Sequence, residues 1–105
     1  MHIAVRILRN DRSTPVGKLA DAEIHFLEGE LAGLKLVGFA VWERRDGPGR
    51  NVTFPARPFI VHGEKRHLAL LRAIDDPNAQ NHIRDLVLRA FDQEVHQEMA
   101  DSATA

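Results

Sequence analysis

The basic residues between positions 44 and 72 are the part of this sequence best suited to binding chemistry. Seven lysines and arginines fall there against two acidic residues, a local balance of +5. Guanidinium groups can take two phosphate oxygens at once, and such contacts weaken with salt and read little base sequence. The segment predicts nucleic-acid binding if its loop tips share one end of a sheet, and otherwise an ordinary solvated surface. The predicted binding residues are Arg44, Arg45, Arg50, Arg57, Lys65 and Arg66.

Histidine is the other abundant residue type with reactive side chains, at six copies in 105 residues. None of them forms an HExxH motif or another recognised ligand pair, although His62 and His67 lie five residues apart in a predicted loop. No serine occupies a GxSxG frame, and the glycine-rich stretch at 47–49 precedes a strand rather than a helix. We therefore expect neither catalysis nor a metal or cofactor. A site that gathers several histidines is the least supported alternative.

Composition and charge narrow the class of protein further. Cysteine is absent, which excludes disulfides and thiolate sites. Arg6 and Arg9 interrupt the apolar N-terminus, and no apolar run approaches the roughly 18 residues of a membrane span, so we expect a cytoplasmic protein. Residues 1–72 carry a net charge of +4 and residues 73–105 carry −5. This asymmetry indicates a basic binding face beside an acidic helix, or solvated surfaces that complement each other in an oligomer.

Hydrophobic patterning predicts four strands in the first half of the chain. Residues 2–9 and 18–27 alternate between apolar and polar side chains, as half-buried strands do. Residues 31–43 are apolar on both faces, with Leu36 and Trp42 on one and Phe39 on the other, which is typical of a central strand. We expect the Trp42 side chain to be buried in the core rather than exposed for stacking on a base. The fourth strand contains Val52, Phe54 and Ala56 and follows a hairpin tip at 44–51. Gly33 and Gly38 each indicate a bulge or a close backbone approach.

The second half of the chain predicts one long helix. Asp76 is the expected N-cap and Pro77 the first helical residue, and the helix is expected to end near Met99. A frayed tail is expected at 101–105. Between the last strand and the helix, residues 57–76 are compatible with either a hairpin or a loop. The apolar stripe expected to cover the sheet comprises Ile83, Leu86, Val87, Ala90, Phe91 and Val95.

These elements predict an α+β fold: an antiparallel meander of four to five strands with one C-terminal helix packed on one face. We expect a single domain over residues 1–100. A one-sided helix leaves the other sheet face or an edge uncovered, so we also expect a homodimer.

Several short residue groups resemble the SpoVG (stage V sporulation protein G, septation regulator) family. The resemblance covers most of residues 3–56 and 80–92, and residues 57–76 form an insertion relative to it. The matching groups are Val5-Arg6-Ile7, Gly17-Lys18-Leu19-Ala20, Leu34-Lys35-Leu36, Phe39-Ala40-Val41, Arg44-Arg45-Asp46-Gly47, Phe54-Pro55, and Ile83, Val87 and Phe91 of the helix.

The resemblance implies a small sheet with a C-terminal helix, a homodimer, and a regulatory protein of the bacterial cytoplasm that binds DNA or RNA without catalysis. The alternative is a homodimeric protein-interaction module that binds no nucleic acid. The salt dependence of the binding affinity distinguishes these two functions, because phosphate contacts weaken steeply with salt and apolar docking does not.

Overall fold

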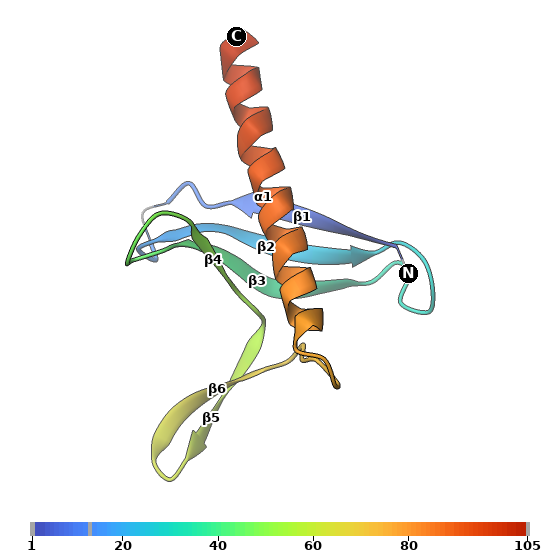
Figure 1. The fold of residues 1–105 in the computed structure, drawn as a ribbon, viewed down its shortest axis with the longest axis vertical. Helices are drawn as coiled ribbons and strands as arrows, with labels where there is room; N and C mark the ends of the chain where they lie inside the picture. The colour runs from blue at the N-terminus through green and yellow to red at the C-terminus, as the bar shows by residue number, and fades with distance from the viewer. Residues whose placement is uncertain (1, 13, 105) are drawn as a thin grey trace.

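The computed structural model describes residues 2–12 and 14–104. It is an α+β fold, as predicted, with a four-stranded antiparallel sheet, a separate two-stranded hairpin and one long C-terminal helix (Figure 1). The larger sheet has the order β1-β2-β3-β4, so each strand pairs with its neighbour in the sequence. The elements are β1 (Ile3–Arg9), β2 (Lys18–Phe26), β3 (Lys35–Glu43), β4 (Arg50–Thr53), β5 (Ala56–Val61), β6 (Glu64–Ala69) and α1 (Asn78–Thr104).

The hydrophobic core lies between α1 and one face of the larger sheet. Val87 and Phe91 of the helix are buried there, and Ile83 and Val95 pack beside them, which confirms the centre of the predicted stripe. Along each strand, every second side chain contributes to the core, because alternate side chains point to the same face of a sheet. The strand residues of this core cluster are Ala20, Ala22, Ile24, Phe39, Val41 and Val52.

A bulge in β3 changes which side chains share a face. Ala22 pairs with Phe39 whereas Ile24 pairs with Leu36, so two residues of β3 oppose one of β2. Gly38 lies in this bulge at a φ of 109°. The extra residue brings Leu36 to the same face as Phe39, where it packs on the core. The prediction that these two side chains face opposite ways was therefore wrong, and the prediction of a bulge at Gly38 is confirmed.

Several element boundaries differ from the prediction. The third strand begins at Lys35 because residues 30–33 form a turn, and Ala56 belongs to β5 rather than to the fourth strand. The 57–76 segment contains a hairpin, whose two-residue turn has φ values of 51° at His62 and 80° at Gly63, as in a type I′ turn. The helix continues to Thr104, so the described part of the predicted frayed tail is helical and residue 105 lies outside the described residues.

The start of α1 agrees with the prediction. The Asp76 carboxylate accepts a hydrogen bond from the Asn78 backbone N–H at 2.9 Å, which is the bond an N-cap makes. Asp76→Ala is expected to lower the free energy of unfolding by about 1 kcal/mol, because this N–H loses its partner. Urea denaturation followed by circular dichroism measures the change. Asp75→Ala removes a neighbouring carboxylate that caps nothing, and an equal loss in that control would contradict the role given to Asp76.

Two parts of the chain extend away from the core. The β5–β6 hairpin lies at one end of the long axis, and the C-terminal part of α1 passes beyond the sheet at the other (Figure 1). The radius of gyration is 15.7 Å, whereas a compact domain of this length has about 13 Å. No helix among the described residues is long and apolar enough to span a membrane.

Candidate nucleic-acid interface

A groove of about 720 Å³ lies beside the tip of the β3–β4 hairpin. We call it the tip groove; its lining includes Trp42, Thr53, Arg44 and Arg45. The turn before β2 contributes Gly17 as part of its wall, and the Glu43 backbone N–H donates a hydrogen bond to the Gly17 carbonyl at 2.8 Å. The tip groove therefore joins two loops that are distant in the sequence.

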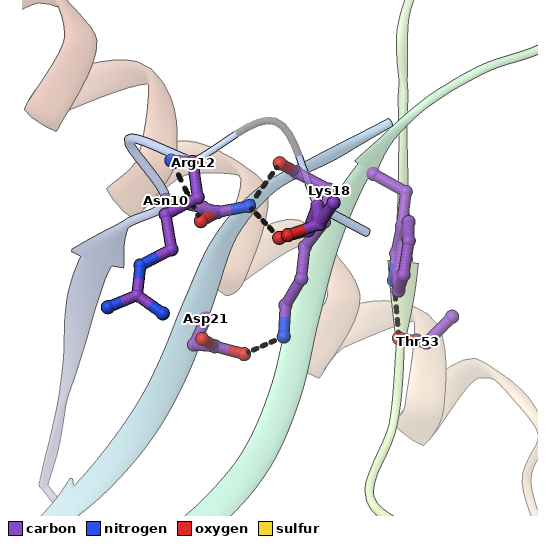
Figure 2. A network of polar contacts seen from close by, with 7 residues as sticks. Asn10, Arg12, Lys18, Asp21 and Thr53 are labelled. Carbon is purple, nitrogen blue, oxygen red and sulfur yellow. Dashed lines mark hydrogen bonds and ion pairs between the residues drawn. The ribbon is translucent and has the colours of Figure 1, made fainter. Parts of the chain in front are cut away.

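Trp42 lies on the sheet face that α1 leaves uncovered. It pairs with Asn51, next to the Val41 and Val52 pair that faces the helix, so its own side chain points the opposite way. The indole is half-buried, and its N–H donates a hydrogen bond to the Thr53 hydroxyl at 2.9 Å (Figure 2). The prediction of a core tryptophan was wrong, because an apolar run on both faces of β3 does not show which face the helix covers.

Polar contacts stabilise the turn that forms one wall of the tip groove (Figure 2). The Asn10 side-chain amide donates to the carbonyls of Lys18 at 3.0 Å and Thr14 at 3.4 Å, and its oxygen accepts from the Arg12 backbone N–H. The Lys18 ammonium lies 2.6 Å from the Asp21 carboxylate. Asn10 is a positioning residue that residue spacing does not reveal, since its carbonyl partners come together only in the folded loop.

The two arginines at the tip differ in their contacts. One guanidinium nitrogen of Arg44 lies 3.7 Å from the Asp46 carboxylate, and both side chains are largely exposed. Arg45 forms no ion pair with any described residue, so its charge is uncompensated locally. A surface ion pair of this length contributes little. Both guanidinium groups are therefore accessible to an anionic ligand.

Arg50 has a structural role that the sequence did not reveal. Its guanidinium forms an ion pair with Asp92 of α1 and lies 4.8 Å from the centre of the Phe91 ring. From the opposite edge of the sheet, Arg9 of β1 lies 5.2 Å from the same ring and pairs with Glu98 at 2.5 Å. The two outer strands thus hold the helix through cation–π and ionic contacts. Arg50 belongs to this cluster as well as to the lining of the tip groove.

The remaining predicted binding residues lie on the other hairpin. Arg57 pairs with Leu68 and Phe59 pairs with Arg66, which places both arginines on one face of β5–β6. Lys65 occupies the opposite face, and Arg66 lies 3.2 Å from Glu64. Figure 1 shows the β5–β6 tip well apart from the β3–β4 tip. The six residues therefore fall into separate groups instead of one patch.

A cluster of charged side chains lies on β2 and β3, on the sheet face that α1 leaves uncovered. A carboxylate oxygen of Glu23 accepts a hydrogen bond from the His25 ring at 2.9 Å, and the Lys35 ammonium lies 3.3 Å from the other oxygen. The His25 hydrogen bond and the positive charge of Lys35 hold the pKa of Glu23 below its ordinary value. Within residues 2–12 and 14–104, no three histidine or carboxylate side chains come together as a metal site.

The chain matches no protein-family model, no curated protein and no solved structure. The resemblance to the SpoVG family stays a prediction from short residue groups.

Proposed function

We propose that this chain is a small regulatory protein, similar to the SpoVG family, that binds DNA or RNA at the tip groove without catalysis. The observation that carries the proposal is the position of Trp42, the one tryptophan in the sequence, in the same groove as Arg44 and Arg45. Aromatic rings beside basic side chains are the elements from which single-strand binding sites are built.

Each group in the tip groove has a distinct task. The Trp42 indole offers a face on which an unpaired base stacks, and its hydrogen bond to Thr53 keeps the ring in one orientation. Arg44 and Arg45 contact the phosphates on either side of that base. Stacking needs a base that is not already paired, so single-stranded DNA or RNA is the preferred ligand. Because every base has an aromatic face, sequence preference is weak.

Arg50 and the second hairpin are not part of the proposed contact. Arg50 acts by holding the helix and the end of β4 in place, through Asp92 and Phe91. Arg57, Lys65 and Arg66 lie on β5–β6, apart from the tip groove. The proposal therefore assigns the binding charge to Arg44 and Arg45.

Fluorescence anisotropy of labelled single-stranded DNA and RNA tests the proposal at low and physiological salt. The wild type is expected to bind, and Arg44→Ala/Arg45→Ala is expected to bind more weakly. The slope of log affinity against log salt should fall in magnitude by about 1.4 in this variant, because each phosphate contact to a single strand contributes about 0.7. Arg57→Ala/Arg66→Ala removes the same charge from exposed positions on β5–β6, apart from the tip groove, and should bind like the wild type.

Trp42 provides a second readout in the same titration. Because it is the one tryptophan, its emission reports on the tip groove directly, and stacking of a base should quench it. Trp42→Leu is expected to weaken binding by about 1–3 kcal/mol, the usual contribution of one stacked base. Trp42→Phe retains an aromatic face and should weaken it less. Absence of binding at low salt by folded wild type, or equal losses in the Arg57/Arg66 control, would contradict the proposal.

The alternative function is a homodimeric protein-interaction module. One observation favours it: Phe59, Ile60 and Leu68 of the second hairpin are exposed apolar side chains. In that case the nucleic-acid titration gives no binding, and apolar substitutions on β5–β6 impair association instead.

A further inference from the structure

A pocket of about 330 Å³ lies between the first turns of α1 and the larger sheet. We call it the helix pocket; its lining includes Ile3, Ile24, Phe26 and Leu36 of the sheet and Ile83 of the helix. The sheet side chains belong to the face that α1 covers, since Ile3 pairs with Phe26 and Ile24 pairs with Leu36. Ligand sites in proteins have volumes of about 300–1,000 Å³, an apolar lining and a few polar groups. The helix pocket has the volume and the apolar lining of such a site.

The residues at the start of α1 explain why this space is not filled by the chain itself. Val87 and Phe91, in the middle of the helix, are buried, whereas Ile83, one turn earlier, is only half-buried. Ala79 precedes Ile83 by four positions and therefore lies on the same helix face. Its methyl group leaves the apolar side chains of β2 and β3 without cover at this end of the core. Apolar surface that stays open to water is unfavourable, and a bound apolar molecule removes that cost.

The polar part of the lining consists of hydrogen-bond donors. Arg72 is exposed, and its guanidinium forms no ion pair or hydrogen bond with any other residue that the structure describes. The carboxylate of Asp76, four positions later, is engaged with the Asn78 N–H. Gln80 donates one amide hydrogen to the Leu71 carbonyl at 3.1 Å and keeps the other. No acidic side chain among residues 2–12 and 14–104 lines the helix pocket, so its polar edge is suited to an anionic group.

The segment that connects β6 to α1 forms one wall of the helix pocket (Figure 1). It is attached at its start, where the Leu70 N–H donates to the Pro55 carbonyl at 2.8 Å, and at its end by the helix cap of Asp76. Between these points, residues 72–75 form no hydrogen bond with other described residues. Ile74, next to the lining residue Ala73, is 96% exposed. This wall is therefore free to adjust to a ligand, and Ile74 offers further apolar surface to cover it.

We propose that the helix pocket binds a medium-chain carboxylate, with its apolar chain against Ile24 and Phe26 and its carboxylate at Arg72. An apolar cavity of about 150 Å³ holds one benzene ring, so a pocket of about 330 Å³ accommodates a chain of about eight to ten carbons. One guanidinium balances the single charge of a carboxylate, whereas a phosphate monoester carries nearly two. The helix pocket shares no lining residue with the tip groove, so this site is independent of nucleic-acid binding.

Isothermal titration calorimetry of the full chain with hexanoate, octanoate and decanoate tests the proposal, at concentrations below those at which micelles form. The affinity is expected to rise about fourfold for each added methylene group, because each is buried in the pocket. Decanol has the same chain as decanoate without the charge, and should bind about tenfold more weakly, the effect of losing one charge-assisted hydrogen bond. Absence of saturable binding of decanoate, or equal affinities of decanoate and decanol, would overturn the proposal.

Substitutions in the lining locate the two ends of the ligand. Arg72→Gln is expected to weaken decanoate binding about tenfold and to leave decanol binding unchanged. Ala79→Phe fills the helix pocket from an exposed position at the start of α1 and should abolish binding of both molecules, while circular dichroism verifies that the variant is folded. Arg89→Gln removes an exposed charge of α1 outside the lining and should bind like the wild type. Unchanged binding by folded Ala79→Phe, or equal losses in Arg72→Gln and Arg89→Gln, would show that the ligand lies elsewhere.

Discussion

Phe91→Ala is expected to lower the free energy of unfolding by about 3–5 kcal/mol, the usual cost of removing a buried phenylalanine side chain. The Phe91 side chain is 2% exposed and lies between the helix and the sheet. Its loss leaves a cavity in a small core and removes the ring beneath the guanidinium groups of Arg9 and Arg50. Because a domain of this kind has a total stability of about 5–15 kcal/mol, the variant should be partly unfolded at moderate temperature.

Two further variants separate the contributions in the same urea denaturation experiment. Phe91→Leu keeps most of the buried apolar volume but removes the aromatic ring, so it isolates the cation–π contacts and is expected to cost less than Phe91→Ala. Met99→Ala truncates a helix side chain that is 66% exposed, and is expected to change stability by less than about 0.5 kcal/mol. A loss of less than 1 kcal/mol for Phe91→Ala would show that α1 does not depend on this ring.

Gly38→Ala is expected to be the second most damaging substitution, at about 3 kcal/mol. The φ of 109° is a conformation that side chains rarely adopt, and an added Cβ would lie 3.0 Å from the Cβ of Pro55. Backbone strain of this kind costs about 1–3 kcal/mol, and overpacking adds a similar amount. Pro55 lies where the chain leaves β4 for the second hairpin, and its ring is part of a rigid segment that cannot move aside easily.

Gly33→Ala is the matched control for this effect. Gly33 also has a positive φ, at 86°, but an added Cβ would meet nothing within 4 Å. Thermal and urea denaturation of the two variants should therefore differ by the cost of the Pro55 contact alone. Equal losses would show that the close approach of Pro55 to Gly38 is unimportant, and that only backbone strain matters at both positions.

The arginines illustrate why charge counts do not identify a site. Arg44, Arg50 and Arg57 contribute equally to the positive balance of the sequence segment. In the folded chain, Arg44 lines the tip groove, Arg50 pairs with Asp92 on the helix, and Arg57 lies on a separate hairpin. An ion pair across 42 residues depends on the docking of α1, and no local pattern contains that information.

Most of the secondary structure was predictable because its causes are local. Alternating apolar residues mark β1 and β2, and Asp76 followed by Pro77 marks the start of α1. The faces of β3 were not predictable in the same way. One extra residue at the bulge exchanges the faces of every side chain before it, so the position of Leu36 relative to Phe39 depends on the register with β2.

Local patterns in the sequence were enough to predict the fold class, the start of the helix, the apolar stripe and the positions of the basic turns. These features depend on backbone preferences and on spacings of two to four residues, which any short segment carries with it. Three arrangements exist only in the folded chain: Trp42 faces away from the core, Arg9 and Arg50 meet at Phe91, and the two basic hairpins lie apart (Figure 1). Those arrangements arise from which sheet face the helix covers and where β4 leaves the sheet, and both are set by contacts between residues far apart in the chain.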